Sequence, residues 1–176
     1  PGTIQPGRYP LDAAFLPRDF MGPDLGSREK LRDASVLLWY PAETDVSIRP
    51  GWFYHPAEDA EVKSPETLVD IYFSSVGRNG VLLLNVPPDR RGLIHESDIA
   101  SLRGMRAILD KTFGTNFADG AEARASSEAS GHSAKAILDG RTETYWTAGE
   151  GVESATFEFE LETEATFDVA LLAEHI

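Results

Sequence analysis

Val81-Leu82-Leu83-Leu84-Asn85-Val86 is an almost wholly apolar run that stops at Pro87-Pro88. A run without polar alternation is typical of a strand that is buried on both faces, as in a parallel sheet covered by helices. A similar run, Val36-Leu37-Leu38-Trp39-Tyr40, stops at Pro41. The two runs therefore predict two parallel strands of one sheet.

A helix is predicted before the run at 81–86. Ser64 is a good N-cap, and Pro65 suits the first helical position because it needs no hydrogen-bond partner for its nitrogen. Apolar residues then recur at helical spacing, and either Gly77 or Asn79-Gly80 ends the pattern.

A second helix is predicted after the run, from Ile99 to Phe113, with Gly114 as its end and His95 as a capping or loop residue. The order strand, loop, helix, strand, loop, helix indicates a parallel α/β sheet with right-handed crossovers. In such folds the chemistry lies on loops after the strands, here 41–54 and 87–95. Residues 1–27 are rich in proline and glycine and predict a long loop.

Composition excludes several classes of protein. The 176 residues carry a net charge of −13, and this argues against a nucleic-acid partner. Cysteine is absent, which excludes disulfides, thiolate zinc sites and a cysteine nucleophile. No apolar run approaches the roughly 18 residues of a membrane span. Most of the negative charge falls after residue 113, so we expect two units of different origin.

The residues after 114 follow a different pattern. Phe157, Phe159 and Leu161 alternate with glutamates, as in a strand with one solvent-facing side. Phe167–Ile176 alternates again and predicts another strand. The region from 116 to 176 is therefore expected to be an all-β unit, part of a β-sandwich, since a whole one needs about 100 residues.

The segment from Trp39 to His55 concentrates the candidate chemistry. It combines aromatic rings with Glu43, Asp45 and Arg49, a set that suits a sugar. Rings stack on the C–H faces of the sugar, and charged groups bond to its hydroxyls. The alternative is that the rings are packing residues and that the three charged residues form a structural ion-pair network.

This segment resembles a signature of glycoside hydrolase family 29, the α-L-fucosidases. The resemblance rests on Trp39-x-Pro41-Ala42-Glu43-x-Asp45-Val46-Ser47-Ile48-Arg49-Pro50-Gly51-Trp52-Phe53-Tyr54-His55 and on the flanking stretches 25–29 and 75–95. It covers about residues 24–115. It implies that residues 1–115 are the C-terminal part of a (β/α)8-like catalytic barrel, and we expect the chain to be a piece of a longer enzyme.

A second resemblance is to the coagulation factor 5/8 type C, or discoidin-like, β-sandwich. Its motif is Ala136-x-x-Asp139-Gly140-x-x-x-Thr144-x-Trp146. The resemblance implies the first part of such a domain at 116–176, with calcium held by Asp139, Thr144 and nearby carbonyls. The alternative is that Asp139 only closes a turn.

The family resemblance implies a retaining exo-glycosidase that removes terminal α-L-fucose from a fucosylated glycan, with α-1,3/1,4 linkages and no catalytic cofactor. Both catalytic carboxylates are expected outside this chain, with Glu43 as the fallback acid/base or a substrate contact. Trp52 is the expected contact for the fucose methyl group. Arg49 and Asp45 are expected either to brace the loop or to reach a second sugar.

Two further hypotheses stay open. The β-sandwich could be a carbohydrate-binding module and the functional unit of the chain. Alternatively, the remainder of the barrel could be a separate chain of a nicked protein, because a two-stranded piece leaves open sheet edges. We expect a periplasmic or secreted bacterial protein without a membrane span.

Overall fold

The computed structural model describes residues 42–173 and 175. The long loop predicted for 1–27 and the strand predicted for 36–40 lie outside the described residues. The described elements follow one another as β1 (Glu43–Ser47), η3 (Pro56–Glu58), α2 (Pro65–Ser75), η4 (Val76–Arg78), β2 (Val81–Asn85), α3 (Glu96–Phe113), β3 (Glu122–Ala125), η5 (Ala134–Ile137) and β4 (Phe157–Glu160).

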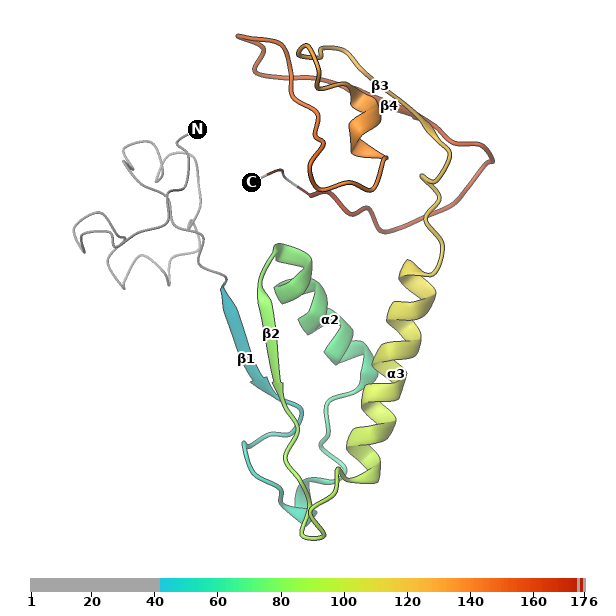
Figure 1. The fold of residues 1–176 in the computed structure, drawn as a ribbon. Helices are drawn as coiled ribbons and strands as arrows, with labels where there is room; N and C mark the ends of the chain where they lie inside the picture. The colour runs from blue at the N-terminus through green and yellow to red at the C-terminus, as the bar shows by residue number, and fades with distance from the viewer. Residues whose placement is uncertain (1–41, 174, 176) are drawn as a thin grey trace, which may run out of the picture.

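Strands β1 and β2 lie side by side and pair in parallel, from Glu43 opposite Val81 to Ser47 opposite Asn85 (Figure 1). The strand predicted at 81–86 is confirmed, but the prediction that all of 41–54 is a loop is wrong. Its first part is β1, although the segment is polar. Strand pairing uses backbone groups, so a polar stretch can form a strand where a partner backbone is available.

The two faces of this sheet differ in their surroundings. Helices α2 and α3 lie on one side of it (Figure 1), and Leu82 and Leu84 are half-buried. Val81 and Leu83, which point the other way, are 45% and 50% exposed. Burial of β2 on both faces is therefore not observed within the described residues. Glu43 and Asp45 share the exposed face, because paired residues of neighbouring strands point to the same side.

Helix α2 begins as its sequence predicts. The hydroxyl of Ser64 accepts a hydrogen bond from the backbone N–H of Thr67 at 3.3 Å, and Pro65 is the first helical residue. The turn after the helix ends at Asn79, whose φ of 63° lies in the left-handed region that asparagine tolerates. Local signals thus fix both ends of this segment.

Helix α3 also matches its prediction, with His95 at the N-cap and Gly114 at the C-cap. It packs against α2 at a very close approach. A Cβ atom on Gly104 would lie only 2.5 Å from Cγ of Pro65. Leu68, which is 1% exposed, lies in the core of this layer. Neither α2 nor α3 combines the length and apolarity that a bilayer span requires.

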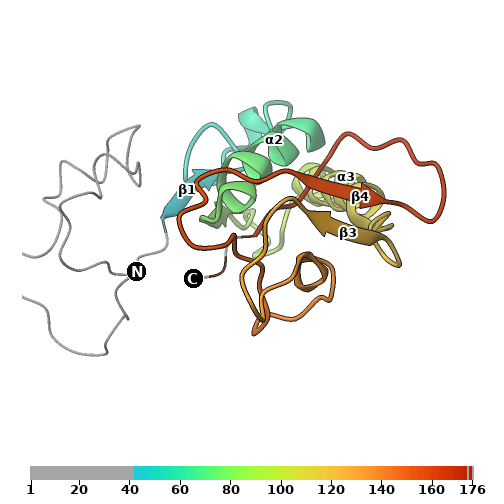
Figure 2. The ribbon, with the colours of Figure 1, turned by 90° about the horizontal axis from the view of Figure 1, so that it is seen from above.

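The C-terminal unit contains one two-stranded antiparallel sheet of β3 and β4. This unit follows the carboxyl end of α3. It lies at the end of the β1–β2 sheet that is opposite to the loops following the two strands (Figure 1), and Figure 2 shows it from above. The indole of Trp146 packs edge-on against Phe157, with ring centroids 4.5 Å apart, and donates to the carbonyl of Ser127.

The predicted strand at 157–161 is confirmed over 157–160, but the strand predicted from Phe167 onward is wrong over 167–173. No strand pairs with this stretch within the described residues, and Leu171 and Leu172 are 81% and 87% exposed. Alternation alone does not make a strand without a neighbouring backbone. A β-sandwich over 116–176 remains a prediction, because the described part of this region contains a single sheet.

Candidate sugar-contacting site

The turn after β1 carries Trp52 and is held by the ends of both strands. The hydroxyl of Ser47, the last residue of β1, donates to the carbonyl of Gly51 at 2.7 Å. The side-chain amide of Asn85, the last residue of β2, donates to the Ser47 hydroxyl and to the carbonyl of Trp52, each at 3.0 Å. The indole of Trp52 is 51% exposed. The strands therefore present an aromatic face to solvent at their carboxyl end.

Lys63 supports the same turn from the helix side. Its ammonium donates to the carbonyl of Ser47 at 2.6 Å, and its backbone N–H donates to the carbonyl of Ile48 at 2.9 Å. The carbonyl of Lys63 in turn accepts from the hydroxyl of Ser101 on α3. These contacts tie the turn to α3 through the segment that precedes α2.

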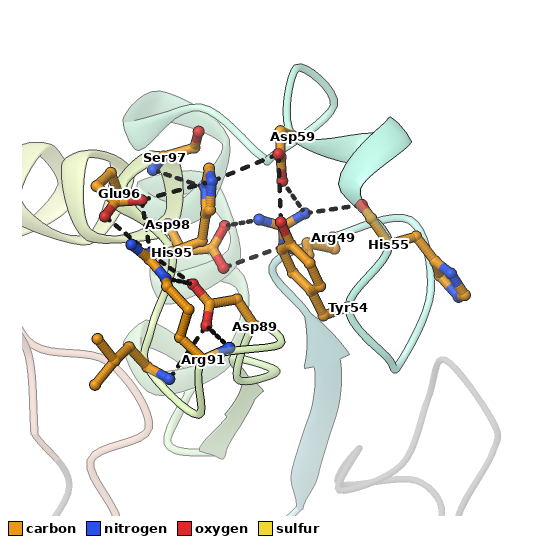
Figure 3. A network of polar contacts seen from close by, with 11 residues as sticks. Arg49, Tyr54, His55, Asp59, Asp89, Arg91, His95, Glu96, Ser97 and Asp98 are labelled. Atoms are coloured by element: carbon orange, nitrogen blue, oxygen red, sulfur yellow. Dashed lines mark hydrogen bonds and ion pairs between the residues drawn. The ribbon is translucent and has the colours of Figure 1, made fainter.

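Arg49 lies beneath this turn and is fully buried. Its Nε donates to Asp98 at 3.1 Å and its Nη1 donates to Asp59 at 3.0 Å (Figure 3). A third contact, from Nη2 to the other oxygen of Asp98, is an ion pair at 3.0 Å but is not aligned as a hydrogen bond. Burial by itself lowers the pKa of Arg49, but the two carboxylates outweigh it and the net shift is upward.

Aromatic and imidazole rings surround this ion-pair cluster. The guanidinium carbon of Arg49 lies 4.7 Å from the ring centroid of Tyr54, within the range of a cation–π contact. Burial and the nearby charge of Asp59 raise the pKa of Tyr54. His55 contributes only its carbonyl, 3.5 Å from Nη1 of Arg49, and its ring points away in Figure 3. Tyr54 and His55 thus occupy supporting positions.

His95 connects the cluster to α3 and confirms the capping prediction. Its Nδ1 accepts from the N–H of Ser97 at 3.3 Å, and its Nε2 lies 3.5 Å from Asp59. Asp59 therefore lies between Arg49 and His95. Through it, the loop after β1 and the loop after β2 form one polar network (Figure 3).

The loop 87–95 has an ion-pair cluster of its own. Asp89, 8% exposed, accepts from the side chain of Arg91 at 2.8 Å and from the N–H groups of Arg91 and Leu93. The Arg91 hydrogen bond is the main reason that the pKa of Asp89 is lowered. Arg91 also donates to both oxygens of Glu96 at the start of α3. These contacts hold the loop closed against the helix.

Glu43 and Asp45 do not belong to either network. Both are exposed on β1, and the carboxylate partners of Arg49 are Asp98 and Asp59. The alternative of an ion-pair network among Glu43, Asp45 and Arg49 is therefore wrong. Glu43 opens the strand, about 13 Å from Ser47 at roughly 3.3 Å per residue. It thus lies at the end of β1 away from Trp52.

The predicted calcium ligands form a turn in the described structure. The hydroxyl of Thr144 donates to Asp139 at 2.7 Å, and the N–H of Arg141 donates to the other carboxylate oxygen at 2.9 Å. The Thr144 hydrogen bond is the main cause of the lowered pKa of Asp139. No cluster of three or more acidic or histidine side chains suited to a metal occurs in the described residues. As placed, these residues close a turn, and calcium binding by Asp139 and Thr144 stays a prediction.

Two hollows of the structure lie away from Trp52. One, of about 320 Å³, lies between α2 and α3 and is lined by Tyr72, Leu109 and Phe113 among others. The other, of about 340 Å³, lies in the C-terminal unit beside His132 and Tyr145. The turn that carries Trp52 lines neither of these two hollows.

Sequence reasoning missed the residues that hold the candidate site together. Asn85 carried one signal, because it is the one polar residue within an otherwise apolar run. Asp59 and Asp98 carried none. Asp98 lies 49 residues from Arg49, and nothing in the local sequence pairs the two.

Comparisons with known proteins show the family of the chain. The family model described as α-L-fucosidase matches residues 17–112, more than half of the chain. A protein of Oryza sativa assigned as α-L-fucosidase 1 is 42% identical over 143 residues, 78% of this chain and 27% of that protein.

Solved structures give the same result. A Bacteroides thetaiotaomicron protein assigned as an α-L-fucosidase is 47% identical, with a TM-score of 0.63 over 74% of this chain and 28% of that one. A family 29 fucosidase of Ruminococcus gnavus, solved in complex with fucose, is 32% identical, with a TM-score of 0.62 over 71% of this chain and 26% of that one. The chain spans about a quarter of the length of these relatives. On the family match and these likenesses together, the chain belongs to the α-L-fucosidase family.

Proposed function

We propose that the protein acts as a retaining exo-α-L-fucosidase that hydrolyses terminal α-L-fucose from glycans, and that residues 42–113 form part of the wall of its sugar site. Membership of the family supports the reaction. One observation supports the site: Trp52 is half-exposed at the carboxyl end of a parallel strand pair, where such folds carry their chemistry.

Trp52 would supply preference for a 6-deoxy sugar. An indole face gains from contact with the C6 methyl group of fucose and cannot hydrogen-bond a hydroxyl placed there. Such an apolar contact can discriminate by about 1–3 kcal/mol. The side chain needs no neighbouring charge for this role.

The catalytic carboxylates are proposed to come from outside the described residues. A retaining mechanism needs two carboxyl groups about 5–5.5 Å apart that flank the scissile bond. Glu43, the fallback acid/base, opens β1 at the end away from Trp52, and Asp45 lies between them on the exposed face. We propose that Glu43 and Asp45 line the interior of the barrel, and that Arg49 braces the loop.

The finer parts of the proposal concern the whole protein. We propose α-1,3/1,4-linked fucose as the substrate and a periplasmic or secreted bacterial location. Within the described residues, β1 and β2 pair only with each other, and their outer edges would pair with the remaining barrel strands, within one polypeptide or as a separate chain.

The test is hydrolysis of an aryl α-L-fucoside by the full-length protein and by its Trp52→Ala variant. We expect kcat/KM to fall by about 10- to 100-fold, the range of a lost apolar contact. Phe53→Ala is the matched control, since Phe53 is the next residue and is 77% exposed. Equal effects of the two substitutions would refute the role of Trp52. Hydrolysis by residues 1–176 alone would refute an external nucleophile.

A carbohydrate-binding module is the second candidate function. The hollow beside Tyr145, which also includes the polar side chains of His132, Lys135 and Glu143, favours it because it combines an aromatic ring with hydrogen-bonding groups. Glycan binding that survives Trp52→Ala but is lost on deletion of residues 116–176 would favour this function over the first.

A further inference from the structure

The two peptide groups that flank the Cα atom of Trp52 are each held by one hydrogen bond. The carbonyl of Gly51, which belongs to the peptide before Trp52, accepts from the hydroxyl of Ser47 at 2.7 Å. The carbonyl of Trp52, which belongs to the peptide after it, accepts from Asn85 at 3.0 Å. Peptide groups are planar, so fixing both planes fixes the two backbone dihedrals between them and the direction of the Cα–Cβ bond.

The side chain of Asn85 makes one of these bonds and contacts the donor of the other. Its NH2 group has two hydrogens, one for the Trp52 carbonyl and one for the Ser47 oxygen. Ser47 has a single hydroxyl hydrogen. The Ser47 oxygen accepts from Asn85 and, at 3.4 Å, from the backbone N–H of Arg49, while its hydrogen is donated to the carbonyl of Gly51. A chain of hydrogen bonds therefore runs from the amide of Asn85 through the hydroxyl of Ser47 to the carbonyl of Gly51.

We infer that Asn85 is a positioning residue that aims the indole of Trp52, with Ser47 as its relay. The inference rests on the proposed function of Trp52 as the contact for the fucose methyl group. The parallel pairing of β1 and β2 uses backbone groups and does not need this side chain. The amide of Asn85 thus does a separate task, which is to hold the turn that follows the other strand.

The substitution Asn85→Asp tests this with almost no change of shape. A carboxylate has no hydrogens to donate at neutral pH, so an oxygen would face the carbonyl of Trp52. Ser47 could turn its hydrogen toward that carboxylate, but it would then release the carbonyl of Gly51. The carbonyl of Trp52 loses its donor, and the carbonyl of Gly51 loses its donor as well if Ser47 turns. Asn79→Asp is the matched control, because it makes the same charge change in an exposed turn before β2.

The first measurement is ¹⁹F NMR of the full-length protein labelled with 5-fluorotryptophan. We expect Asn85→Asp to shift or broaden the Trp52 resonance and to leave unchanged the resonance of Trp146, which packs against Phe157 in the C-terminal unit. Ser47→Ala should perturb the same resonance less, since the bond from Asn85 to the carbonyl of Trp52 does not use Ser47. No change at Trp52 in either variant would overturn the inference.

The second measurement is the ratio of kcat/KM for aryl α-L-fucoside to that for aryl α-L-galactoside, which carries a hydroxyl at C6. We expect Asn85→Asp to lower this ratio by about fivefold or more, a substantial share of what one apolar contact can discriminate. A merely structural residue would lower both rates alike and leave the ratio unchanged, and that result would overturn the inference.

The two measurements separate the inference from the function on which it rests. If the wild-type protein shows no preference for the fucoside while Asn85→Asp still perturbs Trp52 in the spectrum, the proposed function fails and the positioning of Trp52 stands. If the preference exists and neither the ratio nor the resonance responds to Asn85→Asp, the function stands and the inference fails.

Discussion

Replacement of Asp98 by alanine should destabilise the protein strongly, because it would leave a buried guanidinium short of a partner. Arg49 and Asp98 are both 0% exposed and meet through two contacts of 3.0–3.1 Å. Arg49 cannot lose its proton at any accessible pH. It must therefore stay charged in a buried setting after the substitution.

The expected cost follows from the partners that remain. Removal of one member of a buried ion pair costs about 3–5 kcal/mol. Asp59 still accepts from Nη1 of Arg49 at 3.0 Å, so the charge keeps one carboxylate. We therefore expect about 3 kcal/mol, at the low end of that range. Asp98→Asn keeps an acceptor for Nε and should cost less than Asp98→Ala.

Urea unfolding followed by far-UV circular dichroism measures this cost. With a urea dependence of about 1–3 kcal/mol per molar, the midpoint should fall by about 1–3 M for Asp98→Ala. Asp110→Ala is the control on the same helix, since its pair with Arg106 is exposed and we expect no measurable shift. A midpoint for Asp98→Ala that equals that of Asp110→Ala would refute the assigned role of the buried pair.

Three more predictions concern other parts of the structure. Gly104→Ala should lower the free energy of unfolding by about 1–3 kcal/mol in the same urea assay, because its Cβ would lie 2.5 Å from Pro65, and an unchanged midpoint would contradict that close approach. The Arg91 hydrogen bond lowers the pKa of Asp89. The ionised carboxylate of Asp89 therefore stabilises the fold fully above about pH 4, and this stabilisation is lost as the pH falls through the lowered pKa. Asp89→Asn should therefore flatten the acid side of the Tm–pH curve, and a curve parallel to that of the wild type would count against this. If Asp139 only closes a turn, millimolar Ca²⁺ should leave Tm within about 1 °C, whereas a rise of several degrees would show a calcium site.

The sequence predicts well those features that short-range contacts decide. Ser64 and Pro65 start α2, and Asn79 ends the turn after it, because a cap or a left-handed backbone conformation needs only neighbouring residues. Asp98 shows the opposite case. Its pairing with Arg49 depends on the packing of α3 against the loop after β1, which the spacing of residues does not contain.

The two errors about strands have one physical cause. Glu43–Ser47 was expected to be a loop and forms a strand, and 167–173 was expected to be a strand and does not form one. A strand is stable only when another backbone accepts its hydrogen bonds, whatever the pattern of its side chains. Strand β1 has β2 as its partner, whereas no described strand pairs with 167–173. Strand pairing depends on residues that are far apart in the sequence. An alternation of apolar and polar residues permits such pairing but does not produce it.

The supports around Trp52 divide into two kinds that experiments can separate. The cluster of Arg49 and Asp98 is buried and joins β1 to α3, so its loss should appear in the free energy of unfolding. Asn85 and Ser47 act at the carboxyl ends of the strands, on the two peptides beside Trp52, so their loss should appear in sugar preference with little change in stability. If Asp98→Asn changed the fucoside to galactoside ratio as much as Asn85→Asp does, the turn would be a single cooperative unit and this division would fail.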